Sequence, residues 1–403
     1  MSAARERSEP TVARQADPVS RARAVAPIIA AAAARIEAAR ELTEDVLEAL
    51  HGAALFRTLL PRAIGGEEVR PATYVRMMMA LAAADASAAW CLGQSSGCSM
   101  AAAYVAPEVA REVWGGPRGA LAWGAVGNPD QIATVVDGGY RVAGTWPFAS
   151  GGRHATWLGG HCRVKERDGT LRRLPDGGLY ERTMLFPRSA VRMIDAWQVM
   201  GLRGTGSDTY SVQDLFVPEA YTVRRDVEEE RRPHGSGPLY RFSTTHLYAS
   251  GFAGVALGIA RAMLDDFLAL ACAKTPSSTT RRLCDSPVLQ SGLARAEARW
   301  RAARFHLLGV LDEAWDHAAA GEALTLDHKV AIRLAATAAI HEAKQVADFA
   351  YAEAGATAIF ESQPFERRFR DIHAVTQQLQ GRTSHFETVG AHLMGLPVGL
   401  RFL

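Results

Sequence analysis

The hydrophobic period of the chain changes twice along its length, and this change constrains the fold more than any other feature. From about residue 20 to 118, apolar residues recur three and four positions apart in Ala-rich stretches such as YVRMMMALAAADASAAWCLG, which is typical of amphipathic helices. From about 120 to 225 the period falls to two, and turn signals interrupt stretches such as ATVVDGGYRVAGTWPF. This middle pattern predicts antiparallel strands joined by tight turns.

Helical periodicity returns after a charged, Gly- and Pro-containing segment, DVEEERRPHGSGP. It continues in four long stretches, which predict an up-down four-helix bundle; they lie at about 244–273, 287–320, 324–354 and 365–394. Strands and helices do not alternate, and no GxGxxG motif follows a strand, so a Rossmann fold is excluded. The sequence predicts a mainly α protein with a central antiparallel β domain, divided into a disordered tail (1–20), an N-terminal helical domain (21–119), the β domain (120–235) and the bundle (236–403).

Charge and cysteine content narrow the range of partners. The 45 Lys and Arg residues nearly balance 43 Asp and Glu residues, and no basic stripe is interleaved with aromatics, so nucleic acid is not an expected partner. No apolar run is long enough to span a membrane. The five cysteines form no CxxC pairs, and the histidines show no spacing suited to a metal site. We therefore expect a cytoplasmic protein without a bound metal.

Two glycine-containing motifs suggest chemistry that their context does not support. GQSSG at 93–97 matches the GxSxG pattern of serine hydrolases, but it lies in a helical stretch rather than at a strand-to-helix turn, so Ser95 is not expected to be a nucleophile. MGLRGTGSD precedes a predicted strand, whereas a phosphate-binding P-loop precedes a helix. These segments predict helix packing and a tight bend, respectively.

The stretch GTWPFASGG, residues 144–152, has the most unusual composition of the β domain. Two aromatic rings, a hydroxyl and bare backbone at a strand end would suit a flat heteroaromatic ligand. The alternative is that the aromatic side chains only fill the core of the sheet. Together with the neighbouring AWGAVGNPD, this stretch supplies the candidate cofactor-binding residues Trp123, Asn128, Trp146, Phe148, Ser150 and Gly151.

Residues 370–381, RDIHAVTQQLQG, place an imidazole and an amide within two turns of a predicted helix. His373 could transfer a proton near neutral pH, whereas Gln378 could only donate or accept a hydrogen bond. If His373 is the functional residue, the site carries out acid–base chemistry. If Gln378 is, the side chain only positions a ligand.

Several motifs, in order along nearly the whole chain, resemble the acyl-CoA dehydrogenase superfamily; they are PRAIGGEE, AAADASAAW, GYRVAGTWPFASGG, MGLRGTGSDTYSVQDLFVP and FERRFRDIHAVTQQ. The resemblance implies an N-terminal helical domain, a flavin-binding β domain and a C-terminal four-helix bundle. It also implies a homotetramer whose bundle forms the subunit interface.

Two chemistries occur in that superfamily, and the sequence distinguishes them. Its dehydrogenases use a glutamate to remove a proton from an acyl thioester. The position after the RD motif holds Gln378 and Leu379, and the position near the start of the first bundle helix holds His246, Leu247 and Tyr248. Neither position offers a carboxylate. The elements by which dehydrogenases bind FAD are also missing, and their places are taken by CAKTPSSTTRRLCDSP and AEAGATAIF. The chain is thus more similar to the oxygenase components of two-component flavin monooxygenases, which take reduced FMN or FAD from a separate reductase.

The resemblance also assigns roles to individual residues. It places Ser150 near the reactive edge of the flavin, and it places Gln378 where related oxygenases carry a histidine. His373 is then a candidate base, and His246 and Tyr248 are candidate substrate-binding residues. We expect a flavin-dependent monooxygenase acting on a small aromatic or hydrophobic substrate, with Ser150, Gln378 and His373 as catalytic residues. The alternatives are an acyl-CoA dehydrogenase-like oxidoreductase and a non-catalytic binding or assembly module of the same fold.

Overall fold

The computed structural model describes residues 16–277, 279–400 and 403. The predicted tail of residues 1–20 falls mostly on residues 1–15, which lie outside the described residues. Its last part is helical instead, because helix α1 begins at Pro18. The Asp17 side chain accepts hydrogen bonds from the Val19 and Ser20 amides, and a proline in the first turn suits a helix start.

The N-terminal unit is helical, as its period predicts. It comprises α1 (Pro18–Ala39), α2 (Glu44–Gly52), α3 (Pro71–Ala84), α4 (Ala86–Ser99) and α5 (Pro107–Trp114). Nearly every residue of α4 is buried, and its small residues allow close packing. A Cβ atom at Gly97 would lie 2.3 Å from the Tyr248 ring, so only glycine permits this approach. The small-residue composition of α4 therefore serves helix packing.

The β unit forms one sheet in the order β6-β7-β3-β2-β4-β5-β8, with β1 paired to β4. Its strands are β1 (Leu121–Trp123), β2 (Ile132–Val136), β3 (Gly139–Ala149), β4 (Trp157–Lys165), β5 (Glu181–Pro187), β6 (Arg192–Ile194), β7 (Asp208–Pro218) and β8 (Thr222–Val223). Most pairs are antiparallel, as predicted, but β4 pairs in parallel with both β1 and β2. The sheet is therefore mixed.

The C-terminal unit contains α6 (Thr244–Ala273), α7 (Pro287–Ala319), α8 (Leu326–Ala354), α9 (Phe365–Thr376) and α10 (Ser384–Leu393). The prediction of one continuous helix over 365–394 is wrong, because α9 ends at Thr376 and a 3-10 turn precedes α10. Gln378 has an extended backbone there, and its side-chain oxygen accepts a hydrogen bond from the Gln380 amide at 2.7 Å. This local bond competes with helix continuation, so Gln378 lies in a turn.

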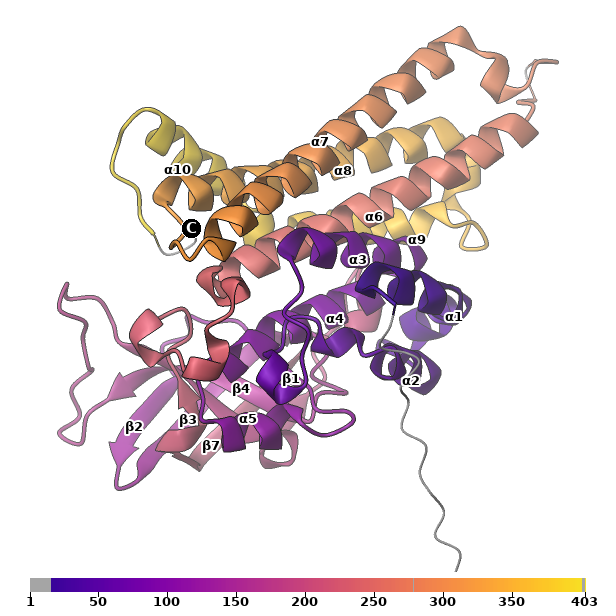
Figure 1. The fold of residues 1–403 in the computed structure, drawn as a ribbon. Coiled ribbons are helices and arrows are strands. Elements are labelled where there is room, and N and C mark those ends of the chain that lie inside the picture. Colours follow the sequence, from indigo (N-terminus) through magenta and orange to yellow (C-terminus); the bar gives the residue numbers. More distant parts are fainter. Residues whose placement is uncertain (1–15, 278, 401–402) are drawn as a thin grey trace, which may run out of the picture.

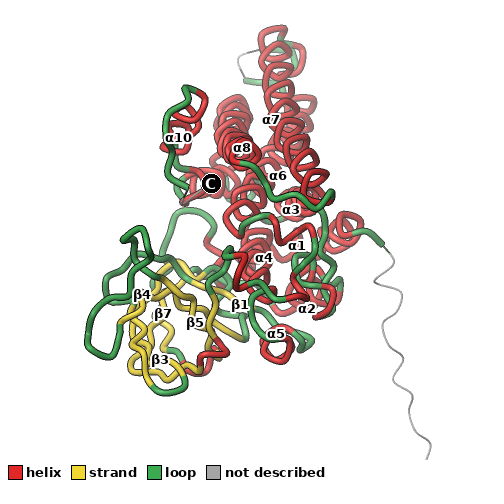
Figure 2. The backbone as a smooth tube through the Cα atoms, turned by 60° about the vertical axis from the view of Figure 1, so that its left-hand side comes forward, coloured by secondary structure: helices red, strands yellow, loops and turns green. Residues whose placement is uncertain are grey.

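Figures 1 and 2 show how the units are arranged: the sheet lies at one end of the molecule, and the long helices α6, α7 and α8 lie at the other. Helices α3 and α4 lie between them, and α6 packs against α3, α4 and α8. Within the described part of the chain, no helix has the length and apolarity needed to cross a membrane.

The RD motif of α9 connects all three units. Asp371 Oδ1 accepts a hydrogen bond from the Leu202 amide at 2.6 Å, and the Arg370 guanidinium donates to the Met200 carbonyl at 2.6 Å. Arg370 also pairs with Glu37 of α1 at 2.7 Å. A Cβ atom at Gly201 would lie 2.2 Å from the Arg370 carbonyl oxygen, so the β-unit loop and α9 approach as closely as glycine allows. The motif holds the loop that precedes β7 in place.

Candidate functional site

One face of α4 gathers side chains from the β unit and the bundle. Trp90, Gln94 and Cys98 lie four residues apart and so share that face. Trp90 Nε1 donates to Ser150 Oγ at 3.0 Å, and Gln94 Nε2 donates to the Trp123 carbonyl at 3.3 Å. Cys98 Sγ lies 3.2 Å from the Tyr248 hydroxyl. This face of α4 is therefore the meeting point of the three units.

An aromatic stack lines the same junction. The Trp90 and Phe252 rings are stacked with centroids 3.9 Å apart, and the Phe252 and Tyr248 rings are stacked at 5.6 Å. All three side chains are buried. The stack connects Ser150, through Trp90, to the beginning of α6, and it keeps this region apolar.

A chain of hydroxyl groups fixes the hydrogen-bonding role of Ser150. Thr205 donates its only hydroxyl hydrogen to the Leu202 carbonyl at 2.8 Å, and Ser207 Oγ lies 2.7 Å from Thr205 Oγ1. Ser207 must therefore donate to Thr205, and Ser150, 2.7 Å from Ser207, must donate to Ser207. Since Trp90 donates to Ser150, the Ser150 oxygen keeps one lone pair free. Ser150 can accept a hydrogen bond from a ligand but cannot donate one.

Phe148 and Gly151 lie beside Ser150 in unusual backbone conformations. Phe148 has φ +64° and is 59% exposed, and its ring packs edge-to-face on Trp197 with centroids 6.1 Å apart. A bulky residue with positive φ is uncommon, and such strain clusters at functional sites. Gly151 has φ +74°, and its amide donates to the Thr205 carbonyl at 3.1 Å. Both residues stay candidates for ligand contact.

Trp146 does not have the predicted role. Its ring is fully buried, stacks on Tyr210 at 5.4 Å, and donates through Nε1 to the His161 carbonyl at 3.0 Å. Residues two apart on a strand normally share a face, but the β3–β7 register shifts between Trp146 and Ala149. This β-bulge sends Trp146 into the core and leaves Phe148 exposed. For Trp146 the core-filling alternative is the correct one.

The two remaining predicted cofactor residues lie in different surroundings. Trp123 is buried at the junction, with the Arg225 guanidinium 4.9 Å from its ring centroid and His161 against its edge. Asn128 lies in the exposed loop that precedes β2. Its side chain donates to the Thr145 carbonyl at 3.3 Å. Asn128 is therefore the more accessible of the two.

The predicted base His373 lies in the bundle, where its contacts are with Asp348 and Phe369. Its Nε2 lies 3.0 Å from Asp348 Oδ1 on α8, and its ring packs on Phe369 at 4.3 Å. The contact with Asp348 joins α9 to α8. The imidazole is thus engaged within the bundle rather than with the groups around Ser150.

The Nε2 atoms of Gln378 and His246 are buried and have no hydrogen-bond partner among the described residues. The His246 Nδ1 accepts a hydrogen bond from the Ser243 amide at 3.0 Å, so its proton resides on Nε2. Burial, together with the charges of Arg333 and Lys329, lowers the pKa of His246 to about 3. The imidazole is neutral near pH 7 and offers a donor, not a base. Buried donors without partners are costly, so each of these two N–H groups needs an acceptor from a ligand or a water.

The thiol of Cys98 and the phenol of Tyr248 at the junction are also neutral near pH 7. Burial raises the pKa of the Cys98 thiol to about 12, and it raises the pKa of the Tyr248 phenol well above its ordinary value. No group of three or more potential metal-ligating side chains occurs in the residues that the structure describes. The arrangement can therefore bind a neutral, flat ligand through hydrogen bonds, and it provides no carboxylate for proton abstraction.

Sequence reasoning did not find Trp90, Ser207, Thr205 or Phe252. Their signal was present in part: WCLGQSSGC has an aromatic, an amide and a thiol four residues apart, although the stretch was interpreted only as helix packing. Ser207 and Thr205 lie in MGLRGTGSD, which was interpreted as a bend. No local pattern indicates that these two segments meet at Ser150.

Comparison with known proteins agrees with this geometry. Residues 250–380 match the family described as acyl-CoA dehydrogenase, C-terminal domain. The chain is 30% identical over 359 residues to indole-3-acetate monooxygenase of Pseudomonas putida, with 88% of each chain covered. It is 28% identical over 393 residues to the oxygenase component of an FADH(2)-dependent resorcinol hydroxylase of a Rhizobium species, with 94% of each covered.

Solved structures give the same result. The structure of XiaF from a Streptomyces species, in complex with FADH2 and glycerol, matches with a TM-score of 0.87 and 25% identity over 96% of this chain and 97% of that one. The HsaA monooxygenase of M. tuberculosis matches with a TM-score of 0.86 and 25% identity, covering 96% of this chain and 99% of that one.

Proposed function

Since this chain belongs to the acyl-CoA dehydrogenase superfamily, among the oxygenase components of flavin-dependent monooxygenases, we propose that it uses reduced flavin and O2 to oxygenate a small aromatic substrate. A separate reductase would supply the flavin, as FMN or FAD. The Acinetobacter baumannii and Rhodococcus relatives are likewise named as monooxygenases and hydroxylases.

The free lone pair of Ser150 carries this proposal. Reduced flavin bears an N–H group at its N5 position, whereas oxidised flavin has only an acceptor there. Ser150 can accept and cannot donate, because its own proton is committed to Ser207. An acceptor facing an acceptor would leave both unpaired, so Ser150 favours the reduced form.

The surface beside Ser150 also suits a flat ring system. The Phe148 ring is exposed, and nothing lies within 4 Å of the position that a Cβ atom would take at Gly127. The Ala125 amide donates to the Pro147 carbonyl at 2.7 Å, which holds the loop of Gly127 and Asn128 next to Phe148. Ring contact from Phe148 and open backbone from Gly127 are what a heteroaromatic ligand requires.

When bound, reduced flavin supplies the two electrons that allow O2 to react. In this proposal Ser150 accepts a hydrogen bond from the flavin, and Gln378, whose buried Nε2 has no partner among the described residues, would supply a donor from the turn after α9. The buried stack of Trp90, Phe252 and Tyr248 excludes water. The alternative, a dehydrogenase, would need a carboxylate in place of Gln378 or near Tyr248, and neither position has one.

The oligomeric state and the cellular compartment of the enzyme are part of the same proposal. We expect a homotetramer, because the bundle leaves large apolar side chains exposed, among them Val288, Phe305 and Phe360. All five cysteines are free thiols, which fits a reducing cytoplasm shared with the reductase.

Anaerobic titration of the purified protein with reduced and oxidised FMN and FAD tests the proposal. We expect the reduced form to bind roughly 10-fold more tightly or better, from one hydrogen bond gained and one unpaired acceptor avoided. Addition of 18O2 and an aromatic substrate panel should then place one labelled oxygen atom in the product. Equal binding of both redox forms, or product without label, would contradict the proposal.

A further inference from the structure

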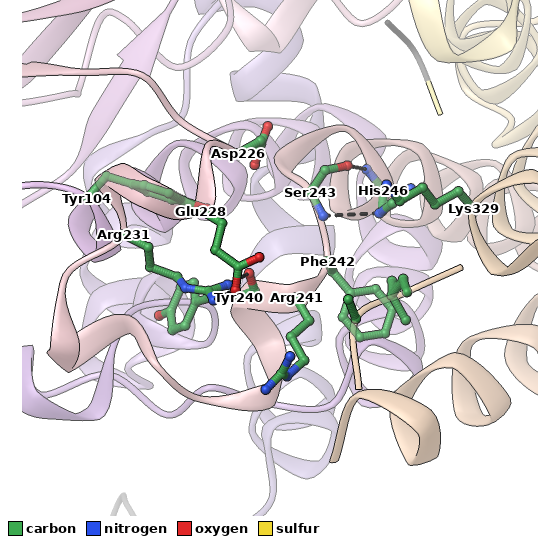
Figure 3. A pocket seen from close by; sticks show the side chains of 12 residues that line it. Tyr104, Asp226, Glu228, Arg231, Tyr240, Arg241, Phe242, Ser243, His246 and Lys329 are labelled. Carbon is green, nitrogen blue, oxygen red and sulfur yellow. Dashed lines mark hydrogen bonds and ion pairs between the residues drawn. The ribbon is translucent and has the colours of Figure 1, made fainter. Parts of the chain in front are cut away.

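A cavity of ≈ 160 Å³ lies at the N-terminal end of α6, between that helix, the segment that precedes it and the beginning of α8 (Figure 3). On the same measure a single water takes roughly 10–15 Å³, so the cavity can hold a group much larger than one water. Tyr104, Tyr240 and Phe242 supply an aromatic wall, and charged, polar and aliphatic side chains supply the rest. None of its lining residues belongs to β3 or to the loop of Gly127 and Asn128.

The cavity lining carries more positive than negative charge, with Arg231, Arg241 and Lys329 against Asp226 and Glu228. Its Glu228 is paired with Arg231 at 2.6 Å, and its Asp226 accepts hydrogen bonds from the backbone and side chain of Thr244 at the start of α6. Arg241 and Lys329 also line it, and neither has an ion-pair partner among the residues that the structure describes. Two cations are thus available to a ligand.

His246 adds a buried donor to these cations. The side chain is 2% exposed and lines the cavity, and its Nε2–H has no acceptor among the described residues. The capping interaction with the Ser243 amide, drawn in Figure 3, fixes which nitrogen carries the proton. A buried N–H of this kind is satisfied only if a ligand or water brings an acceptor.

We propose that this cavity binds the carboxylate of a small aromatic acid. Lys329 and Arg241 balance its charge, His246 donates a hydrogen bond to it, and the aromatic wall contacts its ring. A carboxylate fits because it presents two acceptor oxygens to charged donors. His246 precedes Phe252 by fewer than two turns of α6, roughly 9 Å along the axis, so the cavity and the aromatic stack lie along the same helix. The binding of the acid does not depend on the proposed function. Its identification as the substrate rests on that function.

Calorimetric titration of the flavin-free, full-length protein with phenylacetate and with phenylacetamide tests the site. The two probes share ring and size and differ in charge. We expect phenylacetate to bind at least about 10-fold more tightly, and Lys329→Gln to weaken phenylacetate binding by about 10-fold. Arg241→Gln should weaken it similarly. Lys165→Gln, the same change on β4 of the β unit, is the matched control and should leave the affinity unchanged; the Tm of each variant checks that it is folded.

Equal affinity for the two probes, no detectable binding of either, or unchanged affinity in folded Lys329→Gln would overturn the site. Titration of the same preparations with reduced flavin separates this outcome from failure of the proposed function. If reduced flavin binds and phenylacetate does not, only the carboxylate site is wrong. If phenylacetate binds and reduced flavin does not, only the proposed function is wrong.

Discussion

At the residue scale, the order of donors and acceptors around Ser150 decides what it offers to a ligand. Ser207→Ala removes the acceptor for the Ser150 proton. Ser150 could then donate to an oxidised flavin as well as accept from a reduced one. We expect the ratio of the dissociation constants for oxidised and reduced flavin to fall by roughly 5- to 10-fold, the effect of about one hydrogen bond. Anaerobic titration of both redox forms measures this ratio.

Ser99→Ala is the matched control, because Ser99 is also buried but donates only to the Ser96 carbonyl within its own helix. It should leave the ratio unchanged. An unchanged ratio in Ser207→Ala as well would mean that the direction of the hydroxyl chain does not select the redox state.

Gln378 allows a second prediction at this scale. Gln378→Glu keeps an oxygen to accept the Gln380 amide and removes only the buried Nε2–H donor. We expect the rate of oxygenated product formation with supplied reduced flavin to fall by about 10-fold or more, because a site donor is replaced by a charge. The carboxylate should not create acyl-CoA dehydrogenase activity, since a thioester pocket is not built around it.

The neighbouring Gln377→Glu introduces the same charge at an exposed position and should retain most of the activity. Similar losses in the two variants would assign the effect to charge rather than to the Gln378 donor.

At the scale of elements, the contact between α9 and the loop before β7 depends on a buried carboxyl group. Burial raises the pKa of Asp371 to about 7, and nearby Asp85 adds to the increase. An unfolded aspartate has a pKa of about 3.9, so the folded protein binds more protons than the unfolded one between these values. Stability is therefore lost as the pH rises from about 4 to about 7.

Asp371→Asn removes this loss and keeps a side-chain oxygen for the Leu202 amide. We expect the Tm of the variant to exceed that of the unchanged protein by about 2 °C or more above pH 7, with the difference vanishing near pH 4. Scanning calorimetry at a fixed scan rate across this pH range measures it. Asp176→Asn, in an exposed turn, should show no such trend. A lower Tm for Asp371→Asn at every pH would mean that the carboxylate charge itself stabilises the contact.

At the scale of the whole molecule, the end of α10 is expected to be buried in an oligomer. Leu393 and Met394 are 74% and 79% exposed, which is unusual for adjacent large apolar side chains. The double change Leu393→Lys and Met394→Lys should dissociate the proposed tetramer, and light scattering after gel filtration measures the mass. Glu387 lies on the same helix and is a polar residue, so Glu387→Lys should leave the tetramer intact. A tetramer that survives the double change would place the interface elsewhere.

The sequence by itself determined the order of the units and the chemical character of the site. The change in hydrophobic period predicted helices, then strands, then helices, because the two backbone geometries repeat their exposed faces at different intervals. The absence of a carboxylate at Gln378 and near Tyr248, and the presence of Ser150 in GTWPFASGG, are also facts of the sequence. Read through the resemblance to the acyl-CoA dehydrogenase superfamily, these features distinguished an oxygenase from a dehydrogenase.

Only the tertiary structure decided which side chains meet. The bulge in β3 separates the environments of Trp146 and Phe148, although strand alternation alone predicts the same face for both. The engagement of His373 with Asp348 and the hydrogen bond from Trp90 to Ser150 join residues that lie 25 and 60 positions apart. Such contacts depend on how packed elements approach one another, and local periodicity carries no information about that approach.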